Sequence, residues 1–422
     1  MKLIKRIVSV LAASGLVLTL AACGSSGSSS GTTGGKKVLT VSVDSSNSAY
    51  EKFVKDVSGK FEKDNHATIK IVKKPMFDQL TALNLDGPAG KAPDVMLAPY
   101  DRVGSLGQQG QLLAVDKSNL GSLNQKAQQQ VKVGKKFYGV PETVEALVLY
   151  YNKDLIKKAP TSFKDLEKLA KDKRFAFHSE AGKNTGFLVK WTDFYYAYGL
   201  YAGYGGYVFA KNGTDSKNIG LNNAGSVQAV TYATHWFKEV WPKGMQDVKA
   251  SGNFVTNEFV KGKAAAVIDG PWQAATYKKS KINYGVAKIP TLPNGKEYKP
   301  FAGGKAWVAS SYTKNPSLAK KFLAYVTNAT NAYKFYKFSN EIPINASAQA
   351  KINNSDDQLS KAVISQYDSS TPMPNIPEMA EIWTTMEPAM FNAASGKKTP
   401  KQTLNDAVSS LHKTIAQKYK DK

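Results

Sequence analysis

Hydrophobic and polar positions follow two different periods in the first third of this chain. Residues 39–44 alternate strictly between apolar and polar side chains, the period of a β-strand with one buried face. In residues 50–61 the apolar side chains return every three or four positions, as on one face of a helix. Two more strands are predicted over 67–72 and 94–98, with a short helix around 79–85 between them. Because strands and helices alternate, the pattern predicts an α/β fold with largely parallel strand pairing.

The rest of the chain continues this alternation. Strands are predicted over 144–151, 264–268 and from 307 onward, and helices over 161–169 and 317–326. Thr399 suits a helix N-cap and Pro400 the first position of the last helix. We expect that helix to bury one stripe and to expose His412 on its polar side; the stripe is Leu404, Val408, Leu411 and Ile415.

Two segments stand out against this background. Pro99–Arg102 follows the strand 94–98 directly and is predicted to be a loop. Ligands of open α/β sheets bind beyond the carboxyl ends of the strands, so this loop is a candidate ligand contact. Between Trp191 and Phe209, nine of nineteen residues are aromatic, and we expect most of these rings to pack in the core.

The N-terminus has the features of a secretory signal. Lys2, Lys5 and Arg6 precede an apolar run that ends in Leu20-Ala21-Ala22-Cys23, and a Gly/Ser-rich stretch follows. With cysteine at the first mature position, the segment resembles a bacterial lipoprotein signal. That resemblance implies a signal peptide over 1–22, a lipid on Cys23 and a flexible tether over 23–36. The alternative is a transmembrane helix, but the apolar run is short for the roughly 20 residues that a span needs.

Composition narrows the classes of function. The formal net charge is +24, from 57 Lys and Arg against 33 Asp and Glu. The lysines are scattered and no nucleic-acid-binding signature accompanies them, so we expect a cationic surface and no nucleic-acid partner. Arginine occurs only as Arg6, Arg102 and Arg174. Its planar donor fork cannot be replaced by lysine at a bidentate site, which makes Arg102, next to Asp101, a candidate binding residue.

Catalytic and metal signatures are weak. The four histidines lie far apart without ligand spacing, and the single cysteine allows no intrachain disulfide. We expect no metal and no cofactor. Asp101 and Glu145 could in principle form a glycosidase pair, but sequence does not fix their separation, and we expect a protein that is not an enzyme.

A different set of residues fits a polyhydroxylated ligand. Charged groups form hydrogen bonds to hydroxyls, and flat aromatic faces cover the apolar faces of sugar rings. Both kinds occur here at predicted strand ends or loops: Asp101, Arg102, Glu145, Asp193, Tyr195, Trp272 and Trp383. Each has a plain structural interpretation when taken alone, such as a surface ion pair or a ring filling the core. Their joint occurrence favours a sugar site.

From about Lys37 to the C-terminus the chain resembles the extracellular solute-binding proteins of ABC importers, and within them the maltose/maltodextrin-binding proteins. Several matching passages follow one another in the same order as in that family. They include Ala92–Val95 with Asp101-Arg102, Val144–Leu147 with Tyr151–Leu155, Gly205–Tyr207, Asp269–Trp272, Asn283–Val286, Met373–Pro377 and Asn392–Gly396.

The resemblance implies a two-lobed periplasmic-binding-protein-like α/β fold, with three crossing hinge segments and a ligand cleft between the lobes. Lobe one would comprise 37–143 plus 306–351, and lobe two 148–301 plus 358–422. Matching by position, the family's sugar-hydroxyl contacts on lobe one correspond to Asp101 and Arg102, and its hinge-side acid to Glu145. Its second-lobe acid and stacking tyrosine correspond to Asp193 and Tyr195. Its two stacking tryptophans correspond to Trp272 and Trp383.

Some family residues are not reproduced in this sequence. A tryptophan before the Asp-Arg pair is Ala98, an Asp-Lys pair falls near Ser48 and Ala49, and an arginine after the last tryptophan is Glu387. A family tyrosine falls at Gly252, with Phe254 close by. The first-lobe wall is therefore predicted to be thinner than the second-lobe wall, which permits a preference for longer or differently linked glucans.

The resemblance predicts an extracytoplasmic receptor, anchored to the cell membrane of a Gram-positive surface through Cys23. It would bind maltose, maltotriose and longer maltodextrins as a monomer and deliver them to the membrane subunits of an ABC permease. Three alternatives stay open: the same fold holding another oligosaccharide, a secreted polysaccharide hydrolase, and an adhesin for wall polymers.

Overall fold

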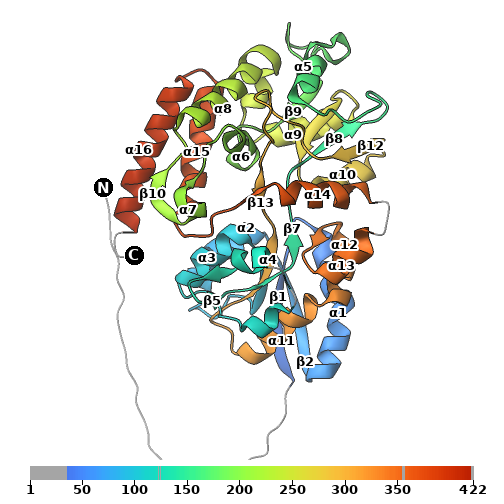
Figure 1. Cartoon of the computed structure of the whole chain (residues 1–422). Coiled ribbons are helices and arrows are strands. Elements are labelled where there is room, and N and C mark those ends of the chain that lie inside the picture. Colours follow the sequence, from blue (N-terminus) through green and yellow to red (C-terminus); the bar gives the residue numbers. More distant parts are fainter. Residues whose placement is uncertain (1–35, 122, 124, 354–356, 420–422) are drawn as a thin grey trace, which may run out of the picture. The chain divides into compact units, whose positions relative to one another are not determined.

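The computed structural model describes residues 36–121, 123, 125–353 and 357–419 (Figure 1). The predicted signal peptide, Cys23 and nearly all of the predicted tether lie outside these residues.

The alternating residues near the start of the described chain form a five-stranded sheet, in the order β2-β1-β3-β14-β6. β1 pairs in parallel with β2 and β3, whereas β14 is antiparallel to β3 and β6. The strands are β1 (Lys37–Asp44), β2 (Ala67–Lys74), β3 (Val95–Pro99), β6 (Val140–Pro141) and β14 (Lys305–Ala309).

Helices alternate with these strands, and α1 lies alongside β1 and β2 (Figure 1). The predicted stripe of α1 is buried, from Tyr50 to Phe61. The helices in these stretches are α1 (Ser48–Asn65), α2 (Met76–Asp86), α3 (Tyr100–Gln108), α4 (Gln125–Gln130), α11 (Pro316–Val326), α12 (Ala329–Ser339) and α13 (Ala346–Asn353).

A second sheet has four strands in the order β12-β8-β11-β9. Only the β11–β9 pair is parallel; β8 is antiparallel to both of its neighbours. The strands are β8 (Val148–Asn152), β9 (Phe187–Val189), β11 (Ala266–Asp269) and β12 (Tyr284–Ala287).

Helices surround this second sheet as well, and α15 and α16 lie side by side (Figure 1). The predicted cap of α16 is confirmed: the Thr399 side chain accepts from the backbone of Gln402, and Gln402 completes a capping box. The helices are α5 (Phe163–Lys171), α6 (Phe194–Gly203), α7 (Ala210–Gly213), α8 (Ala224–His235), α9 (Ser251–Val260), α10 (Ala274–Lys279), α14 (Gln358–Asp368), α15 (Met379–Ala394) and α16 (Pro400–Lys418).

Shorter elements complete the fold. Two small strand pairs join distant segments. β7 (Thr143–Val144) pairs antiparallel with β15 (Ile342–Pro343), and β13 (Phe301–Ala302) pairs in parallel with β16 (Thr371–Pro372). The remaining strands are β4 (Lys132–Val133), β5 (Lys136–Phe137) and β10 (Asp215–Ile219). Single helical turns occur over Lys117–Leu120, Lys173–Phe175, Trp236–Val240, Lys243–Gln246 and Pro271–Gln273.

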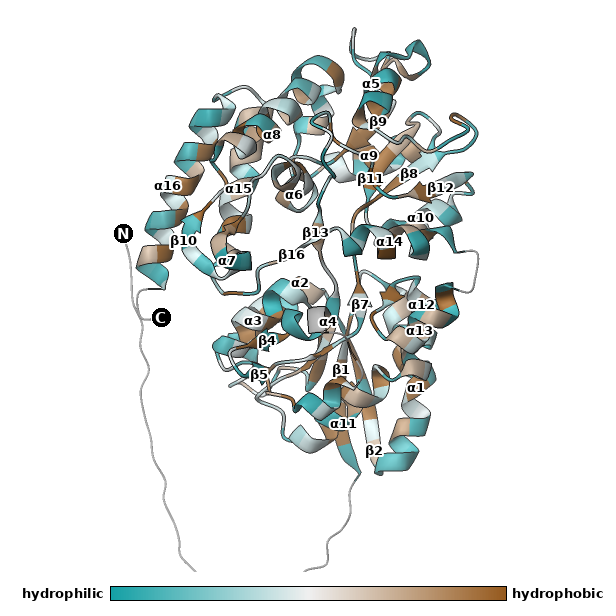
Figure 2. Cartoon of the chain, in the orientation of Figure 1, coloured by the Kyte–Doolittle hydropathy of each residue, from teal (hydrophilic) through white to brown (hydrophobic). Residues whose placement is uncertain are grey.

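Buried apolar side chains form two separate clusters, one around each sheet. The first cluster draws on residues 39–140 and 306–335. The second draws on 144–302 and 342–415, with Ala127 from α4. Figure 2 shows hydrophobic residues on the strands of both sheets and polar residues along one side of α16. The chain passes between the clusters three times: between β6 and β8, between β13 and β14, and between α12 and α14.

The predicted parallel pairing is confirmed for β1, β2 and β3, but it does not extend to the rest of the two sheets, and these passages explain why. A strand that follows a helix in the same layer tends to run parallel to its predecessor. β14 instead arrives from the second cluster and enters the first sheet in the opposite direction. Two local predictions also fail. The predicted loop at Asp101 is the first turn of α3, and the predicted strand over 144–151 is two strands, β7 and β8, separated at residues 145–147.

Candidate functional site

Asp101 and Arg102 lie in the first turn of α3, directly after β3. An acidic residue is favourable at a helix N-terminus, where backbone N–H groups are unpaired. Asp101 is only 9% exposed, and its burial raises the pKa of the carboxyl group, against the opposing effects of Arg102 and Trp383. Arg102 Nε lies 3.6 Å from Asp101 Oδ2. Although buried, this Nε atom has no hydrogen-bond acceptor within the described residues.

Trp383 connects Asp101 to the second cluster. Its indole Nε1 donates to Asp101 Oδ2 at 3.1 Å, and its ring lies 6.0 Å from that of Phe194. Trp383 is half-buried on α15, whereas Asp101 extends from an element of the first cluster. The hydrogen bond therefore joins residues that are 282 positions apart.

A row of aromatic rings continues from Trp383. The ring centroids of Trp383 and Phe301 are 5.9 Å apart, those of Phe301 and Tyr195 6.0 Å, and those of Tyr195 and Trp272 6.0 Å. Phe301 is fully buried and stacks on Tyr198, while Trp272 and Tyr195 are only partly buried. The structure thus brings together the three aromatic residues that the sequence predicted.

Local sequence positions these rings. Asp193 is the N-cap of α6, and its Oδ1 accepts from the backbone N–H of Tyr195 at 2.9 Å. Trp272 lies in the turn after β11, and its indole covers Gly270: a Cβ at Gly270 would lie 2.2 Å from the ring. Asp193 Oδ2 also lies 3.1 Å from Lys190 Nζ, so this carboxylate already holds local structure.

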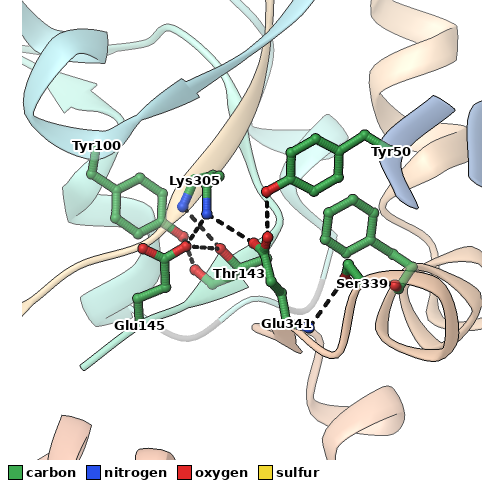
Figure 3. Close-up of polar contacts among 8 residues, drawn as sticks. Tyr50, Tyr100, Thr143, Glu145, Lys305, Ser339 and Glu341 are labelled. Atoms are coloured by element: carbon green, nitrogen blue, oxygen red, sulfur yellow. Dashed lines mark hydrogen bonds and ion pairs between the residues drawn. The ribbon is translucent and has the colours of Figure 1, made fainter. Parts of the chain in front are cut away.

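Glu145 lies between β7 and β8, where its backbone exchanges two hydrogen bonds with Gly303. Its carboxylate forms an ion pair with Lys305, within a buried polar cluster (Figure 3). Burial raises the pKa of Glu145, and Lys305 opposes that effect. A Cβ at Gly303 would lie 2.9 Å from the Tyr195 hydroxyl and 3.8 Å from Glu145 Cβ, so both side chains border this glycine.

Tyr195 lies at the centre of the predicted residues. Burial raises its pKa most, followed by the negative charge of Glu145; Asp101 and Asp193 contribute in the same direction. All seven predicted ligand-binding residues are therefore connected through contacts or charge interactions around the aromatic row.

Among the described residues, the positions that depart from the family pattern add no ring to the aromatic row. Ala98 is fully buried in β3, and Glu387 is exposed on α15. Phe254 packs edge-on against Phe177, at 5.8 Å between centroids, so it does not join the aromatic row through any ring contact among the described residues.

Sequence reasoning missed four residues that hold this region together: Lys305, Glu341, Phe301 and Asp269. Asp269 accepts hydrogen bonds from Tyr196 and Tyr277, and burial raises its pKa to about 6. Lys305 left a readable signal, since it is a lone charge beside the apolar run of β14. Phe301 left none, because one phenylalanine among many has no distinguishing pattern.

Within the described residues, no group of three or more His, Cys, Asp or Glu side chains could hold a metal ion. None of the helices in that part of the chain combines the length and apolar character that crossing a membrane requires.

Comparison with known proteins gives close relatives over nearly the whole chain. The maltodextrin-binding protein MdxE of Bacillus subtilis (strain 168) is 58% identical over 419 residues, covering 99% of this chain and 100% of the relative. The maltose complex of the maltose-binding protein MalE from Listeria monocytogenes is 58% identical with a TM-score of 0.83, covering 91% of this chain and 99% of that one. MalX of Streptococcus pneumoniae in complex with maltopentaose is 45% identical with a TM-score of 0.86, covering 89% and 100%.

These neighbours are two-lobed binding proteins, and the predicted two-lobed α/β fold is confirmed. The family model of bacterial extracellular solute-binding proteins matches residues 57–363. With that match and with relatives that align over nearly their full length, this chain belongs to the bacterial extracellular solute-binding protein family.

Proposed function

We propose that this protein is the maltodextrin receptor of an ABC importer, binding maltose, maltotriose and longer glucans outside the cell membrane. The observation that carries the proposal is the row Trp272–Tyr195–Phe301–Trp383, which ends on the Asp101–Arg102 pair. Relatives whose names or bound ligands are maltodextrins support the same ligand class.

The chemistry of the row suits a glucan. The apolar faces of glucose rings would lie against Trp272, Tyr195 and Trp383, while hydroxyls would face the charged groups. The Arg102 side chain as a whole is 36% exposed, and its accessible guanidinium N–H groups would donate to sugar hydroxyl oxygens. Hydrogen bonds to charged groups contribute roughly 1.5–3 kcal/mol each.

We propose that the chain folds into two lobes, 37–143 plus 306–351 around the first sheet and 148–301 plus 358–422 around the second. Charged groups on the first and rings on the second would both contact a bound sugar. Binding would then stabilise a closed arrangement through contacts that one lobe alone cannot make. The permease would recognise that arrangement. Receptors of this kind need no second copy, and we propose a monomer.

The location follows from the N-terminus. We propose that Cys23 carries the lipid and that residues 23–36 tether the folded part to the outer face of the cell membrane. Replacing Cys23 by serine should release the protein into the medium, and metabolic labelling with a palmitate analogue should lose its signal.

Titration with maltotriose tests the ligand assignment, with tryptophan fluorescence as the signal, since Trp272 and Trp383 should report. A thermal-shift panel of mono- and oligosaccharides gives an independent readout, because a ligand at 100 times its Kd stabilises a protein by about 2.7 kcal/mol. No response to any glucan up to millimolar concentration contradicts the proposal. Selective stabilisation by another oligosaccharide would favour the same fold with a different ligand.

We also propose that the protein is not an enzyme. Incubation with amylose, followed by a reducing-end assay, should show no product. Steady release of reducing ends would instead favour the hydrolase alternative.

A further inference from the structure

Lys305 is a charged residue in an apolar setting. It begins β14, whose remaining residues are Ala306, Trp307, Val308 and Ala309, and it is only 8% exposed. An ammonium group is rarely buried unless it is paired and hydrogen-bonded, because the loss of hydration is costly. The burial of this ammonium group must therefore be compensated by its interaction partners.

Two carboxylates meet the ammonium group. Lys305 Nζ forms an ion pair with Glu145 Oε1 and lies 2.8 Å from Glu341 Oε2. Figure 3 shows the lysine between the two acids, with the Tyr50 hydroxyl donating to the other oxygen of Glu341. Burial alone would lower the pKa of Lys305, but the two carboxylates raise it well above its ordinary value. The lysine is therefore charged and shared between two acids.

The cluster lies where the three passages of the chain meet. Glu145 follows β7, Lys305 begins β14 and Glu341 precedes β15. The backbones are paired as well: Glu142 N donates to Lys305 O at 2.9 Å, and Ile344 N donates to Glu142 O at 2.8 Å. Lys305 thus joins all three segments through one side chain.

The carboxylate of Glu145 is held from one side only. Lys305 contacts its Oε1, and the Thr143 hydroxyl lies 3.5 Å from the same atom. None of the contacts found among the described residues uses Oε2. The Tyr195 hydroxyl borders the same glycine as Glu145, so the open side of the carboxylate belongs to the region of the aromatic row.

We propose that Lys305 is a positioning residue for ligand binding. It holds Oε1 of Glu145, so that Oε2 accepts a hydrogen bond from a ligand hydroxyl. Its second ion pair, with Glu341, links Glu145 to the third passage of the chain. This inference rests on the proposed sugar-binding function and goes beyond it by assigning a role to a residue that would not touch the sugar.

A double-mutant cycle tests the assignment, with maltotriose affinity measured by calorimetry. Glu145→Gln removes the charged acceptor and should weaken binding about tenfold or more. Removing Lys305 alone would leave two buried acids unpaired, so the test variant is Lys305→Met with Glu341→Gln, which leaves a single buried charge. This pair should weaken binding by a similar factor. Adding Glu145→Gln to it should cause little further loss, because both changes act on the same hydrogen bond.

A matched control removes an exposed lysine. Lys334 on α12 pairs with Asp56 on α1 at 2.7 Å, and both side chains are at least 40% exposed. Lys334→Met should leave affinity unchanged. Melting temperatures without sugar report any loss of fold separately from affinity.

The outcomes separate the two proposals. Wild-type protein that ignores every glucan contradicts the sugar-binding function, and the role of Lys305 falls with it. If the wild type binds maltotriose and Lys305→Met/Glu341→Gln binds it equally well, the positioning role alone is wrong. Losses that multiply fully in the triple variant would also overturn that role, since they would show that Lys305 and Glu145 act independently.

Discussion

The two sides of the candidate site differ in the kind of side chain that predominates, although the second also carries the acid Asp193. Elements of the first cluster contribute charges, Asp101 and Arg102 at the start of α3. Elements of the second contribute rings, among them Trp272, Tyr195 and Trp383. A charged group discriminates between hydroxyl orientations, whereas a ring covers any apolar face of suitable size. The difference suggests that the charged side sets the orientation of a ligand and the ringed side supplies most of the binding free energy.

The ringed side is continuous with an aromatic core. Phe163, Trp191, Trp236 and Trp241 belong to the same hydrophobic cluster and are buried almost completely. The site tryptophans differ from these core residues in burial, because Trp272 and Trp383 keep part of their surface exposed. Substitution of a core tryptophan should therefore lower the stability of the fold, whereas the same substitution of a site tryptophan should lower ligand affinity.

The largest effect is expected in the core. Trp236 is 1% exposed and packs against Phe187 and Trp241 at centroid distances of 5.2 and 5.3 Å. Trp236→Ala should lower the free energy of unfolding by about 3–5 kcal/mol, since a large cavity would remain. Urea denaturation measures this loss, with Trp236→Phe as the milder control. The molecules that remain folded should bind maltotriose as the wild type does; normal stability of the alanine variant would contradict a core role.

The stability of the protein is expected to depend on pH through Asp269, which accepts a hydrogen bond from Tyr196. Burial raises the pKa of Asp269 from 3.8 to about 6, against hydrogen bonds from Tyr196, Gly270 and Tyr277. The folded protein then holds this proton more tightly than the unfolded chain does. The contribution to stability is therefore full below pH 4 and is lost as pH rises to 6, by about 3 kcal/mol at most.

Asp269→Asn tests that contribution, because asparagine does not titrate. Unfolding free energies of both proteins at pH 4.5 and pH 7 give the comparison. The wild type should lose more stability than the variant over this interval. Parallel losses would show that Asp269 titrates in the folded protein as it does in the unfolded chain.

The next effect concerns the ringed side itself. Trp272→Ala should reduce maltotriose affinity by about 2 kcal/mol, roughly 30-fold in Kd, and Trp383→Ala should act in the same direction. Melting temperature should change little for Trp272→Ala, because that ring is only partly buried. Trp272→Phe keeps an aromatic face and serves as the control. A fall in melting temperature comparable to that of Trp236→Ala would instead show that Trp272 stabilises the fold as a core residue does.

Periodicity was a good guide to elements and a poor guide to their pairing. The stripe of α1 and the cap of α16 depend on neighbouring residues, so both could be predicted. The direction of β14 depends on where the chain returns from the second cluster, which no local pattern encodes. Asp101 was assigned to a loop because it closely follows the predicted strand over 94–98, yet Pro99, the last residue of β3, is also the N-cap of a helix that begins at the next residue.

The site shows the same division. Asp101, Arg102 and the three partly buried rings could be named from residue type and from the family resemblance. The row that connects those rings needs Phe301, and the orientation of Glu145 needs Lys305 and Glu341. These contacts join residues that are between 36 and 160 positions apart, so only the fold brings them together.

One residue tests the contrast between the two sides directly. Phe77 is a ring on the charged side: it lies on α2 and is 54% exposed. The guanidinium carbon of Arg102 lies 6.0 Å from its ring centroid. A cation–π contact at an exposed position contributes about 0.5–1 kcal/mol.

Phe77→Ala should therefore weaken maltotriose binding only about two- to fivefold, by loosening Arg102, with no measurable change in melting temperature. Leu85→Ala is the matched control, since Leu85 lies on the same helix and is 74% exposed without a ring. Calorimetric titration of both variants gives the comparison. A loss for Phe77→Ala as large as that for Trp272→Ala would mean that the charged side carries a stacking face of its own. Phe77 would then compensate for the tryptophan that Ala98 replaces, and the division into a charged and a ringed side would not hold.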